Sequence, residues 1–76
     1  MLTIYTTQNC SKCRLTERLL TAGGVEHETT LATDDDITRF HEAGVRSFPV
    51  VLIDGKIAWS DFDPDKIKEV INDGKP

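Results

Sequence analysis

The chain lacks several features on which larger, secreted or membrane proteins depend. With 76 residues, it has room for one small hydrophobic core and none for a second. No run of about 18 apolar residues occurs, so the sequence contains no candidate transmembrane helix. Its N-terminal segment also lacks the basic and apolar regions of a secretory signal peptide. We therefore expect one domain over residues 1–76, located in the cytoplasm and without a membrane partner.

Basic residues are fewer than acidic residues in this chain. The chain has 9 Lys and Arg against 13 Asp and Glu, for a formal net charge of −4. Acidic residues gather in two stretches, 34–36 and 61–65. Nucleic acid is excluded as the main partner, because phosphate binding needs clustered Lys and Arg. Nothing in the composition demands an assembly, so we expect a monomer.

Cysteine occurs only twice, as Cys10 and Cys13. A C-x-x-C pair at the start of a helix places both sulfurs on one face, within bridging distance. Unpaired N–H groups and the helix dipole stabilise a thiolate there. In such motifs the thiol pKa falls from about 8.5 into a range of about 3.5 to 7.5. We predict that Cys10 attacks a disulfide as a thiolate and that Cys13, one turn inside the helix, resolves the mixed disulfide.

A metal site is the main alternative for the two cysteines. A structural zinc site needs four Cys or His ligands, and only His27 and His41 remain, with 13 residues between them. Zinc within one chain is therefore disfavoured, whereas a zinc or iron–sulfur centre shared between two chains stays open. Lys12, between the cysteines, either favours the Cys10 thiolate by its charge or is an ordinary solvated helix residue.

Apolar periodicity and turn residues predict seven elements in the order strand, helix, strand, helix, strand, strand, helix. The expected strands cover residues 2–6, 25–31, 49–53 and 56–59. The expected helices cover residues 11–22 and 34–43, with a third that begins at 64 and ends at 72–74. Because C-x-x-C beside a βαβ unit is typical of the thioredoxin-like fold, we expect an α/β protein: a four-stranded mixed sheet flanked by three helices.

Sequence patterns also predict how these elements pack. Leu15, Leu19 and Leu20 are apolar at helical spacing along the first expected helix. Glu26 and Glu28 place the second strand at a sheet edge. The run 49–53 is short, β-branched and the most apolar in the chain, so we expect it to be a central strand.

Further site candidates come from outside the cysteine motif. Pro49 opens the most apolar run, and its peptide bond is either trans, the ordinary state, or cis, as in about 5–6% of X–Pro bonds. Trp59 and Phe62 either pack in the core or form a docking surface, with Ser60 shaping the turn between them. Arg46 docks an acidic partner, lowers the Cys10 pKa, or is an ordinary solvated loop residue.

Three segments of the chain resemble the NrdH-redoxin family of glutaredoxin-like proteins. They are residues 4–6 leading into the motif 10–13, residues 48–51, and residues 59–65, which are similar to the family pattern W-S-G-F-x-P-D. The last segment is the most specific. C-x-x-C and a following Pro-Val are shared with glutaredoxins and thioredoxins, so they discriminate little.

The resemblance implies a thioredoxin fold and a cis Pro49 in the substrate loop, beside the Cys10–Cys13 disulfide. It implies a dithiol electron carrier with no bound cofactor, reduced by NADPH through thioredoxin reductase, a flavoprotein. The implied acceptor is class Ib ribonucleotide reductase, and other protein disulfides are possible. The residues expected to contact partners or to close off the site are Lys12, Arg46, Phe48, Trp59, Ser60 and Phe62.

Two positions depart from the family pattern. Asp61 stands where the family usually has glycine, and Asp63 stands where it often has a basic or neutral residue. Glycine adopts positive φ cheaply, whereas aspartate does so at some cost. Two added negative charges would also alter partner choice. A glutathione-dependent glutaredoxin remains the alternative enzyme, although residues 54–63 contain no Gly-Gly-x-Asp-Asp segment of the kind that holds glutathione.

Overall fold

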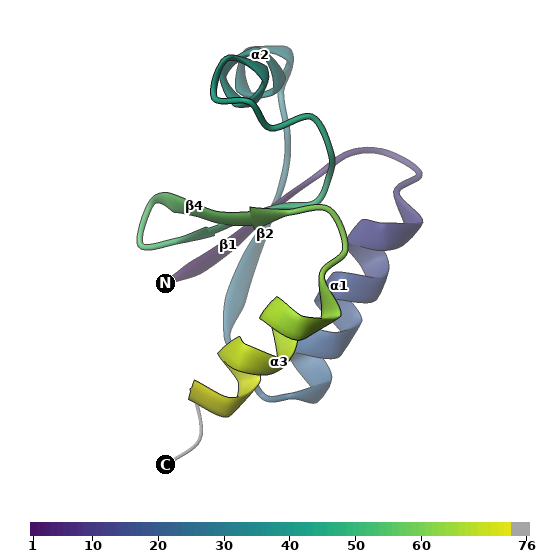
Figure 1. Ribbon diagram of the computed structural model, residues 1–76. Coiled ribbons are helices and arrows are strands. Elements are labelled where there is room, and N and C mark those ends of the chain that lie inside the picture. Colours follow the sequence, from purple (N-terminus) through teal and green to yellow (C-terminus); the bar gives the residue numbers. More distant parts are fainter. Residues whose placement is uncertain (74–76) are drawn as a thin grey trace.

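The computed structural model describes residues 1–73 and contains the seven elements in the predicted order (Figure 1). The strands are β1 (Leu2–Thr6), β2 (His27–Leu31), β3 (Val50–Ile53) and β4 (Lys56–Ser60). The helices are α1 (Ser11–Ala22), α2 (Asp34–Glu42) and α3 (Pro64–Asp73). The third helix was predicted to end at residues 72–74, and Gly74 lies outside the described residues.

The four strands form one mixed sheet in the order β2-β1-β3-β4. β1 pairs in parallel with β2 and antiparallel with β3, and β3 pairs antiparallel with β4. The parallel strands β1 and β2, together with α1 between them, form the βαβ unit that the sequence predicted. The apolar strand β3 is central and β2 is at an edge, as their compositions predicted.

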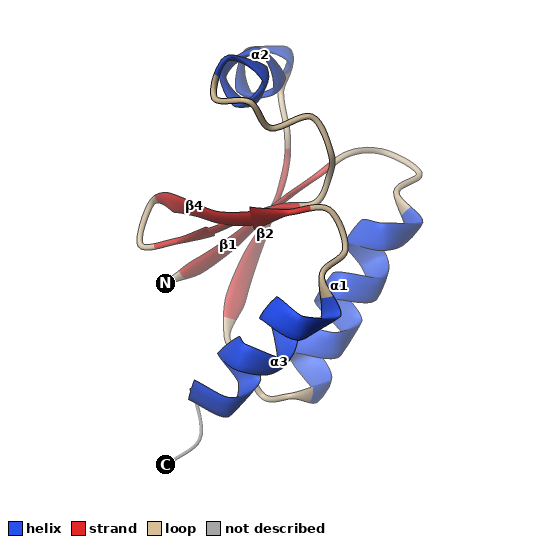
Figure 2. Ribbon diagram, viewed as in Figure 1, coloured by secondary structure: helices blue, strands red, loops and turns tan. Residues whose placement is uncertain are grey.

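The helices lie on both faces of the sheet, with α1 and α3 on one side and α2 on the other (Figures 1 and 2). Beneath α1 and α3 is a cluster of buried apolar side chains. Its members are Leu2, Ile4, Leu20, Val51, Trp59 and Ile67. On the α2 side, the ring of Phe40 packs edge-on against Tyr5 and Phe48, with ring centroids 5.2 Å and 6.0 Å away. The second contact fixes the residue before Pro49.

The leucines of α1 differ in burial: Leu20 belongs to the core cluster and Leu19 is partly buried against it. Cys13, Thr16 and Leu20 are buried, whereas Leu15 is 40% exposed. Residues 13, 16 and 20 recur at spacings of three and four and share one helix face, and Leu15 lies outside it. Burial of Thr16 costs little because its hydroxyl donates a hydrogen bond to the Lys12 carbonyl oxygen at 2.9 Å. Of the three leucines at helical spacing, Leu15 is the exposed one.

Element boundaries follow local hydrogen bonds. β2 begins two residues later than predicted because the Val25 N–H donates to the Leu20 carbonyl at 2.9 Å and completes the turn after α1. At the start of α2, the Thr33 hydroxyl accepts from the Asp36 N–H and the Asp36 carboxylate accepts from the Thr33 N–H, which is a capping box. Thr33 is therefore the N-cap of α2, directly before the predicted helix start at residue 34.

Candidate active site

The chain reaches the cysteines through a sharp turn after β1. Asn9 has a φ of 57°, in the left-handed region that asparagine tolerates better than most residues. Cys10 then adopts extended backbone (φ −99°, ψ 101°) as the N-cap of α1. Its Sγ accepts a hydrogen bond from the Cys13 backbone N–H at 3.1 Å. A sulfur thus takes the place that a Ser or Asp oxygen usually has at a helix start.

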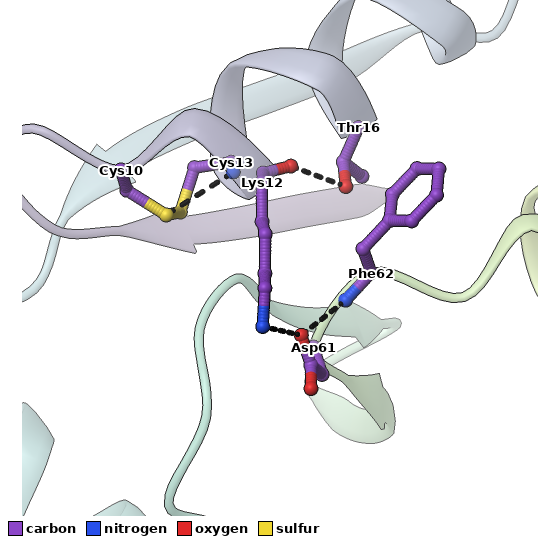
Figure 3. Close-up of a disulfide and its surroundings, with 6 residues drawn as sticks. All are labelled: Cys10, Lys12, Cys13, Thr16, Asp61 and Phe62. Atoms are coloured by element: carbon purple, nitrogen blue, oxygen red, sulfur yellow. Dashed lines mark hydrogen bonds and ion pairs between the residues drawn. A yellow bond between two sulfur atoms is a disulfide. The ribbon is translucent and has the colours of Figure 1, made fainter.

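Cys10 and Cys13 form a disulfide, with their Cα atoms 5.2 Å apart (Figure 3). The two residues differ in accessibility. Cys10 is half-buried, whereas only 1% of Cys13 is exposed. A partner approaching this surface therefore meets Cys10 before Cys13.

The second segment of the site is the loop that leads into β3. The Phe48–Pro49 peptide bond is cis, the geometry that the family resemblance implies. Pro49 is buried, and its carbonyl oxygen accepts from the Asp61 backbone N–H at 2.9 Å. This bond extends the pairing of β3 with β4 and links the proline loop to the turn between β4 and α3.

Asp61 connects that turn to the cysteine motif. Its φ is 68°, in the left-handed region that glycine adopts at little cost. One carboxylate oxygen, Oδ1, accepts from Lys12 Nζ at 2.9 Å and from the Phe62 N–H at 2.7 Å (Figure 3). The hydrogen bond from Lys12, followed by that from Phe62, lowers the pKa of Asp61 below its usual range. The carboxylate is therefore charged at neutral pH.

Trp59 reaches the core through a β-bulge. Val51 pairs with Trp59 and Leu52 pairs with Ile57, so Ala58 is an extra residue in β4. The Trp59 side chain belongs to the apolar cluster and is 7% exposed. Within residues 1–73, its buried indole Nε1 has no hydrogen-bond partner. The structure therefore places Trp59 in the core, where its contribution is packing.

The remaining candidates lie around these segments. Phe62 is half-buried and packs against the core cluster, and Ser60 is half-buried opposite Val50. Arg46 is exposed, and the structure records no ion pair for it within residues 1–73. Of the candidate partner-binding residues, Lys12 has a direct side-chain link to another part of the site.

Residues 1–73 contain no group of three or more His, Cys, Asp or Glu side chains arranged to hold a metal ion. In the same residues, no helix has the length and apolar character needed to cross a membrane.

Sequence reasoning missed two features of the site. Asn9 was not singled out, although an asparagine just before a helix N-cap is a recognisable signal for left-handed backbone. The Lys12–Asp61 pair joins residues far apart in the chain, and one sequence contains no sign that they meet.

Comparisons with known proteins agree with this architecture. A family model described as Glutaredoxin matches residues 2–58. The glutaredoxin-like protein NrdH of Salmonella typhimurium is 35% identical over 71 residues, covering 91% of this chain and 86% of the relative. The solved NrdH-redoxin of Escherichia coli is 30% identical with a TM-score of 0.79, covering 99% of this chain and 95% of that chain. A glutaredoxin from Archaeoglobus fulgidus, 23% identical with a TM-score of 0.68 and covering 92% and 84% of the two chains, shows the fold alone.

The sheet, its helices and the cysteine pair at the start of α1 define a thiol–disulfide oxidoreductase with a thioredoxin-like fold. The chain belongs to the glutaredoxin family, and its relatives over nearly the whole length are glutaredoxin-like NrdH proteins. The predicted fold class and family resemblance are confirmed.

Proposed function

We propose that this oxidoreductase is an electron carrier that thioredoxin reductase reduces and that in turn reduces protein disulfides, chiefly that of class Ib ribonucleotide reductase. The observation that supports it most is the asymmetry of the cysteine pair. Cys10 is accessible and its sulfur accepts the Cys13 N–H, whereas Cys13 is buried. The same N–H favours a thiolate at Cys10 once the disulfide is reduced.

In the proposed reaction, the Cys10 thiolate attacks one sulfur of the partner disulfide. A Cys10–partner bond forms, and the other partner sulfur leaves as a thiolate and takes up a proton. Cys13 then loses its proton and attacks Cys10 Sγ, which releases the second partner sulfur as a thiol. The carrier ends as the Cys10–Cys13 disulfide, and the partner has gained two electrons and two protons, one proton from Cys13 and one from solvent. NADPH supplies the next electron pair through the flavin of the reductase, so the carrier needs no bound cofactor.

The choice of reductant is supported by the relatives and by the chain itself. The Escherichia coli NrdH-redoxin is described as having a thioredoxin-like activity profile. In this chain, residues 59–65 follow the NrdH pattern except at Asp61 and Asp63. We propose the same preference for thioredoxin reductase over glutathione here. The carrier would act as a single-domain monomer in the cytoplasm, where dithiols stay reducible.

The proposed docking surface surrounds Cys10. Pro49 presents the substrate loop, Phe48 is held beside it by Phe40, and the exposed Arg46 precedes both. Lys12 borders the same surface from α1. Trp59 and Phe62 do not contact the partner in this proposal. Their packing in and against the core cluster positions the turn that contains Ser60.

Substitution of each cysteine separates the two roles. We expect Cys10→Ser to lower disulfide reduction to the background rate, because the attacking thiolate is gone. Cys13→Ser should accumulate a covalent adduct with a protein disulfide substrate, detected by mass under non-reducing conditions. Full activity of Cys10→Ser, or adducts on Cys13 in that variant, would contradict the proposed roles.

A further inference from the structure

The Lys12–Asp61 ion pair joins the two segments that border the cysteines. Lys12 lies between Cys10 and Cys13 in the chain and extends from the first turn of α1 to the turn after β4 (Figure 3). Asp61 is held from two other sides, because its N–H donates to the Pro49 carbonyl and its Oδ1 accepts the Phe62 N–H. Asp61 is thus held by backbone groups of its own turn and of the proline loop, and the ion pair joins Lys12 to it.

We propose that Asp61 is a positioning residue that captures Lys12, neutralises its charge and so sets the electrostatic environment of the Cys10 sulfur. A lysine in the first turn of α1 would, if unpaired, add a positive charge to the segment that contains the thiolate. Bound to Asp61, the same lysine is part of a neutral pair. The inference rests on the proposed role of Cys10 as the attacking thiolate.

The two charges of the pair have opposite effects, and this is what makes the inference testable. A unit charge about 10 Å from a thiolate shifts its pKa by about 0.3 units in a water-like dielectric, and by more where water screens less. Loss of the Asp61 charge exposes Lys12, and loss of the Lys12 charge exposes Asp61. A merely structural contact would give the same result whichever side is removed.

Other charged side chains lie on the segments that meet at the pair. They are Arg14 on α1, Arg46 before Pro49, and Asp63 and Asp65 after Asp61. All of them stay unchanged in the variants compared, so their effect on Cys10 cancels in the differences.

The experiment measures iodoacetamide alkylation of Cys10 against pH, in the Cys13→Ser background so that one thiol reports. Asp61→Asn keeps the side-chain oxygen for the Phe62 N–H and tolerates positive φ. We expect it to lower the apparent pKa of Cys10 by about 0.3 units or more, which is about twofold in thiolate at a pH below that pKa. Lys12→Gln should raise the apparent pKa by a similar amount, and the double variant should return it close to the starting value.

Asp54→Asn is the matched control. Asp54 also has a positive φ (52°) and also forms an ion pair, with the N-terminal ammonium at 2.7 Å. It lies in the hairpin at the opposite end of β4 from Asp61, so its replacement should leave the apparent pKa of Cys10 unchanged. If Asp61→Asn folds poorly, Asp61→Gly makes the same change of charge with a residue suited to the left-handed backbone.

Opposite shifts that shrink in about 1 M salt would support the inference, because screening weakens charge effects and not packing effects. If Cys10 of the starting protein is alkylated normally, pKa shifts of the same sign in both single variants, or no shift in either, would overturn the inference about Asp61. Failure of iodoacetamide to alkylate Cys10 in the starting protein would instead overturn the attacking role on which the inference rests.

Discussion

Individual residues with unusual backbone conformations frame the cysteine motif. Asn9 turns the chain just before Cys10, and Asp61 turns it just after β4, both with positive φ. In each case a short polar side chain stands where glycine would fit without strain. Asp61 adds a function that glycine lacks, since its carboxylate holds Lys12. At these two positions the backbone conformation favours glycine, yet a polar side chain is present.

Replacement of Asn9 tests the importance of that turn. Asn9→Ala should lower the free energy of unfolding by about 1 kcal/mol, because alanine in the left-handed region brings its Cβ close to the following carbonyl oxygen. Asn9→Gly should cost clearly less, since glycine adopts positive φ without that contact. Urea denaturation of the two variants measures the difference. Equal stability of the alanine and glycine variants would show that the turn relaxes.

Residue by residue, the sequence identified the cysteine pair and its neighbours well, because C-x-x-C at a helix start is a local pattern. It did not identify the burial of Thr16 in preference to Leu15, which depends on the direction from which the sheet contacts α1. The Lys12–Asp61 contact could not be predicted either, because it depends on how β4 pairs with β3 and where the turn after β4 then lies.

At the scale of single elements, the capping box at the start of α2 shows how a local pattern becomes stability. Thr33 and Asp36 satisfy each other's backbone N–H groups, and Asp36 also pairs with Arg39. The hydrogen bond from the Thr33 backbone is the largest cause that lowers the Asp36 pKa. This pattern is readable from the sequence, and the predicted start of α2 is confirmed.

The lowered pKa of Asp36 gives stability a defined pH dependence. Between the folded and unfolded pKa values, the unfolded chain binds more protons, so stability increases with pH there. The contribution is complete above about pH 4, the ordinary aspartate value, and is lost as the pH falls through the lower folded value. Asp36→Asn should therefore lower the urea midpoint at neutral pH and make progressively less difference in acid.

Asp35→Asn is the control for that prediction. Asp35 is an exposed aspartate in the same helical turn, so its replacement makes the same change in charge without breaking the box. Its effect on the urea midpoint should be smaller at neutral pH. Equal effects of the two variants would mean that the helix dipole, and not the capping box, explains the contribution of Asp36.

On the scale of the whole molecule, α1 and α3 share one face of the sheet, and their contact depends on Gly23 (Figure 1). A Cβ at Gly23 would lie 2.5 Å from Cγ1 and 2.6 Å from Cδ1 of Ile71. The φ of Gly23 is −82°, which any residue adopts. The requirement for glycine here therefore comes from close packing between two helices and not from the backbone.

Gly23→Ala should destabilise the protein by about 1–3 kcal/mol, the usual cost of overpacking a core. Ile71→Ala in the Gly23→Ala background should cost less than Ile71→Ala alone, because it removes the atoms that the new methyl group meets. Urea denaturation of the two single variants and the double variant gives the coupling. Additive costs would mean that α3 shifts away from α1 and that the contact is not close in solution.

Periodicity and turn residues predicted most of the architecture, including the order of the seven elements and the edge position of β2. They did not predict the extra residue at Ala58 or the direction of Trp59. A bulge changes which face a strand residue points to, and neither composition nor spacing marks it. Sequence reasoning therefore left Trp59 open between core and surface, and packing placed it in the core.

The central claim is that this chain carries electrons from thioredoxin reductase to disulfides through Cys10 and Cys13. The most direct test follows NADPH oxidation with a protein disulfide substrate, using either thioredoxin reductase or glutathione with glutathione reductase. We predict sustained turnover with thioredoxin reductase, loss of that turnover in Cys10→Ser, and little turnover with glutathione. Turnover that requires glutathione and does not occur with thioredoxin reductase would contradict the account.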